Sequence, residues 1–348
     1  MARGRGDQGP QRHRIAYDSR LRPAGGGDPP RPSGHAVTAP GIIAFTGGTG
    51  FVGQAVCDAI ERQGLEARAL ARRIPDDRRT GIEWVQGDLA NRDALARLID
   101  GAACVIHIAG LTNTPDPAQF DTVNVDGTRN VVAACKAAGV KRLVLVSSLS
   151  ARKPELSRYG ASKAKAEEVV QASGLDWTIV RPPAVYGPRD TEMFELFRGA
   201  KWGFVPLPPG GATSIIHADD LAELLVCLAG PASSQSGDTI RRRLFEPDDG
   251  REGGWAHKEL ARAIGKAVRR PVFAPHIPER WLYKAAALDR KFRGDKAKLT
   301  EDRVGYMVHP NWVSRFDRDV PETVWTPRIS GEQGLAATAR WYREQGWL

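Results

Sequence analysis

Thr46-Gly-Gly-Thr-Gly-Phe-Val-Gly53 is the stretch that decides the fold expected of this 348-residue sequence. An apolar run at Ile42–Thr46 precedes it and a segment with helical periodicity follows at Val52–Gln63, so we predict a strand, a tight turn and a helix. In that setting the G-x-x-G-x-x-G spacing favours a dinucleotide-binding loop over a plain tight turn. Glycines let backbone amides approach a pyrophosphate, and the helix N-terminus attracts it. The predicted cofactor contacts here are Gly47, Thr49, Gly50, Phe51, Val52 and Gly53.

Outward from this loop, short apolar runs alternate with longer mixed segments. The predicted strands are 42–46, 66–71, 83–85, 104–108, 143–147 and 176–181, and the predicted helices are 52–63, 92–99, 124–138, 159–173, 219–229, 256–267, 279–293 and 331–345. This alternation predicts an α/β fold, a Rossmann-type doubly wound parallel sheet covered on both faces. We expect a Rossmann dinucleotide-binding core at 40–182 and a smaller, mostly helical C-terminal substrate lobe at 183–348, with 213–240 returning to the core.

The residues at the end of the second strand, about 20 residues after the glycine loop, are expected to determine whether NAD or NADP binds. An NAD site would place Asp or Glu there, but this sequence has Arg72 and Arg73. Two guanidinium groups suit a 2′-phosphate, so NADP(H) is the predicted cofactor. The alternative is that both arginines only begin a solvated loop.

A second motif, Tyr159-Gly-Ala-Ser-Lys163, opens the predicted helix 159–173. Its i,i+4 spacing places phenol and ammonium on one face, where the ammonium should lower the pKa of the phenol. A phenol whose pKa is shifted toward the working pH is suited to proton delivery to a carbonyl oxygen. Ser147 and Ser148 end the preceding strand, at the sheet edge where ligands bind in such folds. The spacing alone is common on helix surfaces, but beside this serine and the glycine loop it predicts catalysis.

From about residue 41 onward the chain resembles the short-chain dehydrogenase/reductase superfamily, in its extended, epimerase/dehydratase-like branch. The resemblance rests on both motifs and on Gly87-Asp-Leu89, His107-Ile-Ala-Gly110, Val123-Asn-Val-Asp-Gly-Thr-Arg-Asn130, Val146-Ser-Ser148, Arg181-Pro-Pro-Ala-Val-Tyr-Gly-Pro188, His217-Ala-Asp-Asp-Leu221 and Trp341–Leu348.

The resemblance implies roles for several residues. Ser148 would polarise the carbonyl, Tyr159 would be the general acid, and Lys163 would hold the nicotinamide ribose and tune Tyr159. Asn124 would support that helix or a proton relay, with a structural hydrogen bond as the alternative. Further cofactor contacts implied are Asp88, Leu89, Ala109, Gly110, Pro182 and Val185. A homodimer through helices 124–138 and 159–173 is an expectation of the same kind.

One departure from the branch bears on the substrate. Only eleven positions separate Ser148 from Tyr159, whereas sugar-nucleotide epimerases and dehydratases carry a longer insertion, and no Thr-Asp-Glu triplet lies near Ser148. Both differences favour simple carbonyl reduction. The segment Val146–Tyr159 is similar to reductases of long-chain 3-keto amines such as 3-ketosphinganine, in sphingolipid (ceramide) synthesis. It is also similar to an NADPH-binding accessory subunit of respiratory complex I.

The substrate lobe is apolar around 193–208 and basic further on. In the helix 279–293, apolar residues recur at helical spacing with Lys and Arg interleaved. Either this helix packs on the core with its basic stems snorkelling, or the basic segment 279–298 docks on an anionic membrane. We therefore predict NADPH-dependent reduction of an apolar, lipid-like ketone to a secondary alcohol. A structural NADPH-binding subunit and a nucleotide-sugar epimerase or dehydratase are the alternatives.

Charge and cysteine usage exclude other classes. The net charge of +9 is concentrated in residues 1–39, at +4, and in residues 262–298, at +8. The predicted catalytic core is therefore near neutral, which argues against nucleic-acid binding. The cysteines lack metal-ligand spacing, so no metal is expected, and a reducing cytoplasm fits them. Residues 1–39 are expected to be a disordered basic tail, with neither a secretory signal nor a membrane span in the chain.

Overall fold

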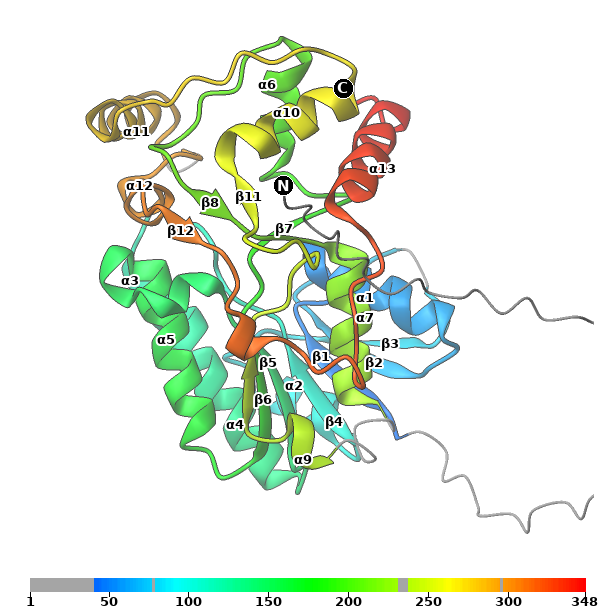
Figure 1. Cartoon of the computed structure of the whole chain (residues 1–348). Coiled ribbons are helices and arrows are strands. Elements are labelled where there is room, and N and C mark those ends of the chain that lie inside the picture. The colour runs from blue at the N-terminus through cyan, green and yellow to red at the C-terminus, as the bar shows by residue number, and fades with distance from the viewer. Residues whose placement is uncertain (1–40, 77–78, 231–236, 295–296) are drawn as a thin grey trace, which may run out of the picture. The chain divides into compact units, whose positions relative to one another are not determined.

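The computed structural model describes residues 41–76, 79–230, 237–294 and 297–348, so the expected tail at 1–39 lies outside the described residues. Within these ranges, seven strands form one parallel sheet in the order β10-β6-β5-β4-β1-β2-β3 (Figure 1). They are β1 (Ile43–Thr46), β2 (Ala67–Ala71), β3 (Ile82–Gln86), β4 (Cys104–His107), β5 (Arg142–Val146), β6 (Asp176–Val180) and β10 (Arg243–Phe245). The predicted α/β doubly wound fold is confirmed.

Helices cover both faces of the sheet. Ile43 and Phe45 of β1 pack with α1 (Phe51–Arg62) and α7 (Ala218–Ala229). Ala44, between them, belongs to the opposite face, where α2 (Arg92–Ile99), α4 (Gly127–Ala137) and α5 (Arg158–Gln171) pack. Because both faces are buried, the central strands are apolar throughout instead of alternating.

The strand order reverses direction between β1 and β4, which are hydrogen-bonded neighbours. The chain winds outward from β1 through β2 to β3 and then crosses back to β4. The glycine loop leaves the carboxyl end of β1, and Ala109–Gly110 leave that of β4, so both lie at the switch point where such folds bind ligands.

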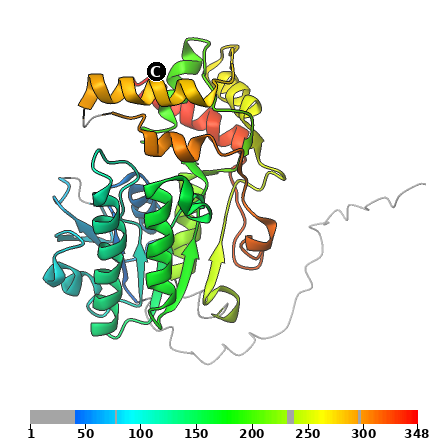
Figure 2. The same cartoon turned by 90° about the vertical axis from the view of Figure 1, so that its left-hand side faces the viewer.

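The substrate lobe lies over the carboxyl edge of this sheet (Figures 1 and 2). Its core packs Tyr186, Phe197, Trp255, Leu335 and Tyr342 together. Its elements include β7 (Ala184–Tyr186), α6 (Phe194–Lys201), β8 (Ala212–Thr213), β9 (Ile215–His217), β11 (Trp255–Ala256), α10 (His257–Val268), α11 (Glu279–Arg293), α12 (Glu301–Met307), β12 (Asn311–Trp312) and α13 (Gly331–Glu344). The shorter α3 (Ala118–Phe120) and α9 (Gly237–Ile240) lie in connections.

Several elements of the substrate lobe, among them α6 and α12, were not predicted, and two elements of the core differ from the prediction. The return to the core extends beyond residue 240, because β10 pairs with β6 as the edge strand of the sheet. The helix predicted from Asn124 begins earlier, as a π-helix η1 over Asp121–Asp126 that continues into α4. None of the helices in the described ranges has the length and apolar character needed to cross a bilayer.

Candidate active site

The loop after β1 has the shape of a phosphate cradle. Gly47 has a φ of +79°, and a Cβ there would lie 2.8 Å from the backbone nitrogen of Ala109. A Cβ on Gly53 would lie 2.0 Å from the carbonyl oxygen of Gly47, so only glycine fits where α1 meets the loop. Gly50 caps α1 without a side-chain hydrogen bond, and the first turn holds no acid. The amides at this N-terminus therefore suit a dinucleotide phosphate.

The structure brings the predicted adenosine-side residues to the same edge of the sheet. Arg72 and Arg73 follow β2 directly and are exposed. Within the described ranges, neither guanidinium forms an ion pair or a hydrogen bond. The Asp88 carboxylate already accepts the N–H groups of Ala90 and Asn91, at 2.9 and 3.0 Å, so it shapes its own turn. Leu89 packs close to Gly127.

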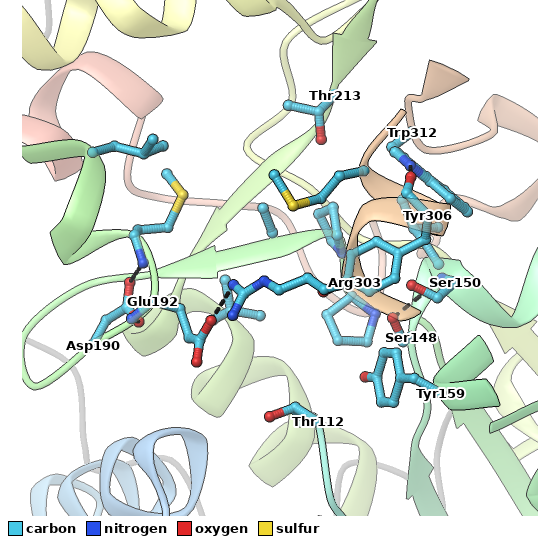
Figure 3. Close-up of a pocket in the computed structure, with 18 of the residues that line it drawn as sticks. Thr112, Ser148, Ser150, Tyr159, Asp190, Glu192, Thr213, Arg303, Tyr306 and Trp312 are labelled. Atoms are coloured by element: carbon cyan, nitrogen blue, oxygen red, sulfur yellow. Dashed lines mark hydrogen bonds and ion pairs between the residues drawn. The ribbon is translucent and has the colours of Figure 1, made fainter. Parts of the chain in front are cut away.

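The predicted catalytic residues converge at the carboxyl end of β5. Ser148 follows this strand, and its hydroxyl accepts the N–H of Ser150 at 3.2 Å. Tyr159 lies in the first turn of α5, which begins where it does because the Ser157 hydroxyl accepts the N–H of Gly160 at 2.9 Å. Lys163 is buried one turn later. All three line one cavity, and Figure 3 shows Tyr159 and Ser148 together at its base.

The expected lowering of the Tyr159 pKa by Lys163 is not what the structure gives. Burial raises the pKa of Tyr159 to about 12, and hydrogen bonding with Ser148 only partly offsets the rise. The Lys163 ammonium instead donates to the carbonyl oxygen of Val146 at 2.7 Å. Burial lowers the pKa of Lys163 to about 8, opposed by the charge of Glu167. Tyr159 is therefore a protonated phenol, which is the form a general acid needs.

Asn124 lies in the π-helix and has its side chain fully engaged. Its Oδ1 accepts the N–H of Leu111 at 2.7 Å, while its Nδ2 donates to the Leu111 carbonyl and to the Ser162 hydroxyl at 3.0 and 2.9 Å. Asn124 thus ties the loop after β4 to helix α5. Of the two roles expected for it, this geometry favours support of α5 over a proton relay.

Sequence reasoning missed the residues that α12 contributes. The Asp302 carboxylate accepts the N–H groups of Arg158 and Tyr159 and so caps α5 from the other lobe. The ring of Tyr306 lies 6.2 Å from that of Tyr159, centroid to centroid. Arg303 forms an ion pair with Glu192 across the cavity (Figure 3). The signal available was weak, because a seven-residue helix shows little periodicity.

Behind Ser148 lies a buried ion network that also escaped prediction. The Ser147 hydroxyl donates to Glu167, and Arg181 makes two hydrogen bonds to the same carboxylate, at 2.8 and 2.6 Å. Arg181 also lies 3.5 Å from Glu246, which pairs with Arg152 at 3.2 Å. The network fixes the end of β5 from which Ser148 projects.

The whole arrangement encloses a cavity of about 630 Å³. Its base is formed by Ser148, Tyr159 and Lys163, and Gly110, Pro182 and Val185 border the same space. The walls that the substrate lobe adds are largely apolar and include Leu196, Val205, Leu207, Leu260, Met193, Met307 and Trp312. A hydride donor held at the glycine loop would thus face a largely apolar chamber with Ser148, Tyr159 and Lys163 at its base.

Comparison with known proteins agrees with this geometry. Residues 47–228, more than half of the chain, match the family described as NAD(P)H-binding. The chain belongs to this NAD(P)H-binding family. It is an extended reductase of the short-chain dehydrogenase type, and it is an oxidoreductase.

Two relatives of this NAD(P)H-binding protein match along nearly their whole length. A "ceramide reductase" of Caulobacter vibrioides is 34% identical, over 90% of this chain and 98% of the relative. A "2-alkyl-3-oxoalkanoate reductase" of Stenotrophomonas maltophilia is 28% identical, over 84% and 97%.

Solved structures share the fold of this NAD(P)H-binding protein. The crystal structure of gox2253 has a TM-score of 0.69 at 24% identity, and MoeE5 with UDP-glucose and NAD has 0.65 at 21%. Each covers 88% of this chain and 99% of the solved one.

Proposed function

We propose that this protein uses NADPH to reduce the ketone of a long-chain 3-oxo lipid, such as 3-ketosphinganine or its N-acylated form, to a secondary alcohol. The observation that carries the proposal is the acid–base cluster of Ser148, Tyr159 and Lys163 at the base of a largely apolar cavity of about 630 Å³. The names of two full-length relatives, which refer to a ceramide and to a 3-oxoalkanoate, support it. The reaction would belong to sphingolipid synthesis.

The residues of the cavity divide the chemistry between them. NADPH, held by the glycine loop, would supply the hydride to the carbonyl carbon. Ser148 would donate a hydrogen bond to the carbonyl oxygen, and Tyr159 would transfer its phenolic proton to that oxygen as negative charge develops there. The ammonium of Lys163, whose pKa burial lowers to about 8, would stabilise the phenolate left behind. Asn124 would keep α5, and with it Tyr159, in place.

The choice of NADPH over NADH rests on Arg72 and Arg73. Both are exposed at the end of β2, where the adenosine ribose lies in Rossmann folds. Free guanidinium groups offer bidentate, charge-assisted hydrogen bonds to a 2′-phosphate. Among the described residues, no carboxylate forms an ion pair with either guanidinium.

A lipid is favoured over a sugar nucleotide by the charges of the cavity. Its substrate-lobe cations are Arg303 and Lys298. Arg303 is already paired with Glu192, and Lys298 with Glu195 at 2.6 Å. A second pyrophosphate would need unpaired cations, whereas a ketone with one neighbouring polar group needs only one or two hydrogen bonds. We place the reaction in the cytoplasm, since all four cysteines are free thiols.

The test is NADPH consumption by the full chain against a panel of ketones. The panel contains 3-ketosphinganine, its N-acylated form, a 3-oxoalkanoate and UDP-sugars, each dispersed in detergent where needed. We expect turnover of a long-chain 3-oxo compound and none with UDP-sugars. Tight NADPH binding without turnover of any ketone would instead support a structural subunit, and a thermal shift with a UDP-sugar would support an epimerase.

A further inference from the structure

The substrate lobe carries an aromatic–basic surface that the fold leaves uncovered. It consists of three segments, and its apolar members are Trp202, Phe204, Phe273, Trp281, Leu288 and Phe292, all exposed. Trp202 is 82% exposed, Phe273 69% and Phe292 81%. Large apolar side chains grouped in this way on a surface mark a binding site.

Backbone pairing holds two of the three segments together. Phe204 pairs with Phe273 and Leu207 with His276 in isolated parallel bridges, and the rings of Phe204 and Phe273 lie 6.2 Å apart. Helix α11 begins directly after this ribbon, at Glu279. Figures 1 and 2 both place α11 and the ribbon on the side of the lobe away from the seven-stranded sheet.

Helix α11 exposes its apolar stripe instead of burying it. Its inward face is formed by Leu282, Ala286 and Asp289, of which only Ala286 is fully buried. Trp281, Leu288 and Phe292 recur at i, i+7 and i+11, on a face about 110° away. The packing explanation for this helix therefore holds for Leu282 and Ala286, whereas Trp281, Leu288 and Phe292 stay exposed.

Cations accompany this stripe. Arg280, Lys284 and Lys291 form a row along the other side of it, and Lys284 lies 4.6 Å above the Trp281 ring. In the ribbon, Lys201 directly precedes Trp202, and Arg269 with Arg270 precede Phe273. The carboxylate of Asp289 in α11 accepts the N–H groups of Lys298 and Leu299 and forms an ion pair with Arg293.

We infer that this aromatic–basic surface docks the protein on an anionic lipid bilayer. Aromatic and aliphatic side chains flanked by Lys and Arg are the chemistry of a helix lying in the membrane interface, with rings below the headgroups and cations among the phosphates. A second copy of the chain fits less well, because both partners would bring the same excess of cations to a symmetric interface.

The surface also continues into the cavity, which connects docking with the proposed function on which this inference rests. Leu207, Pro208, Lys298 and Leu299 line the cavity. His276 of the ribbon hydrogen-bonds the Pro208 carbonyl at 2.7 Å, and Asp289 of α11 holds Lys298 and Leu299. A lipid in the contacted leaflet would therefore have a short path to Tyr159.

The test is co-sedimentation of the full chain with vesicles of phosphatidylcholine alone or mixed with phosphatidylglycerol. We expect binding to the anionic vesicles that weakens with salt. The double variant W281E/F292E should bind on the order of a hundredfold more weakly. Loss of Lys284 and Lys291 to Gln should cost about fivefold per cation. The matched control is F316E, because Phe316 is 91% exposed on another segment, η5 (Phe316–Arg318), beside Glu246.

Three results would overturn the docking inference: no binding to either vesicle, equal binding by W281E/F292E, or a dimer of the wild type that this variant converts to monomer. Turnover of detergent-dispersed lipid should be the same in W281E/F292E and wild type, since neither residue lines the cavity. Vesicle binding without turnover of any ketone would count against the proposed reaction alone. Turnover without vesicle binding would count against docking alone.

Discussion

The carboxylate of Asp302, on α12 of the substrate lobe, accepts the backbone N–H of Tyr159 at 3.3 Å. It also accepts the N–H of Arg158, so a residue 143 positions further along the chain caps the first turn of the helix that carries the general acid. Substrate lobe and catalytic helix are thereby joined at the point where the chemistry takes place.

This contact predicts a specific defect in Asp302→Ala. The free energy of unfolding should fall by about 1 kcal/mol, the usual effect of losing a helix cap, and kcat should fall because Tyr159 is less firmly held. The Kd for NADPH should not change. Asp302→Asn, which can still accept a hydrogen bond, should recover most of the activity; equal activity in all three proteins would refute a positioning role.

The pH dependence of the reaction should follow Lys163. Its pKa in the folded protein is about 8, lowered by burial from an ordinary 10.5, so the ammonium is lost as pH rises through about 8. Tyr159 keeps its proton to about pH 12 and adds no limb below that. We expect kcat/KM for NADPH to fall about tenfold per pH unit above pH 8.

The lowered pKa of Lys163 also makes the free energy of unfolding depend on pH. Between pH 8 and 10.5 the unfolded chain binds more protons at Lys163 than the folded one, so this group makes unfolding less favourable as pH rises there. For the reaction itself, a profile of kcat/KM for NADPH that stays flat to pH 10 would show that the charge of Lys163 plays no part in turnover.

The cofactor prediction is tested by Arg72→Ser/Arg73→Ser. Loss of charge-assisted hydrogen bonds to the 2′-phosphate should raise KM for NADPH about ten- to a hundredfold. KM for NADH should change little, because NADH has no phosphate there. A wild-type preference for NADH in steady-state kinetics would contradict the assignment.

The buried ion network predicts a large loss of stability in Arg181→Met. The change leaves Glu167 and Glu246, with side chains 4% and 1% exposed, without their shared cation. Chemical denaturation should show a loss of about 3–5 kcal/mol. Arg129→Met is the control, because its pair with Asp126 is exposed and should contribute less than about 1 kcal/mol. Similar losses in both variants would mean that the buried network contributes no more to the free energy of unfolding than an exposed ion pair does.

The sequence was sufficient to predict the sheet and to place the glycine loop, Ser148 and Tyr159 at its carboxyl edge, because those features are local. Continuous apolar runs mark strands buried on both faces, and the glycine spacing fixes the turn after β1. Strand β10 escaped because Arg243–Phe245 is three residues long with an exposed first residue, which leaves no pattern to detect.

The missed parts of the site are contacts between distant segments. The i,i+4 spacing of Tyr159 and Lys163 predicts a shared helix face, but not that the ammonium is directed to the Val146 carbonyl. Likewise no local pattern indicates that Arg303 and Tyr306 of α12 reach the cavity, or that Asp302 caps α5. Periodicity suggested that α11 is amphipathic, but only packing decides whether its apolar stripe is covered.

The most direct test of the central claim is transfer of deuterium from [4-²H]NADPH to a long-chain 3-oxo lipid, followed by mass spectrometry of the product. Both C4 epimers of the labelled cofactor are used, with wild type and Tyr159→Phe. We predict a 3-hydroxy lipid that carries one deuterium at C3 from one epimer only. Tyr159→Phe should bind NADPH normally but form product about 10²- to 10⁴-fold more slowly. Unlabelled alcohol, no alcohol from any 3-oxo lipid, or full activity in Tyr159→Phe would contradict the account.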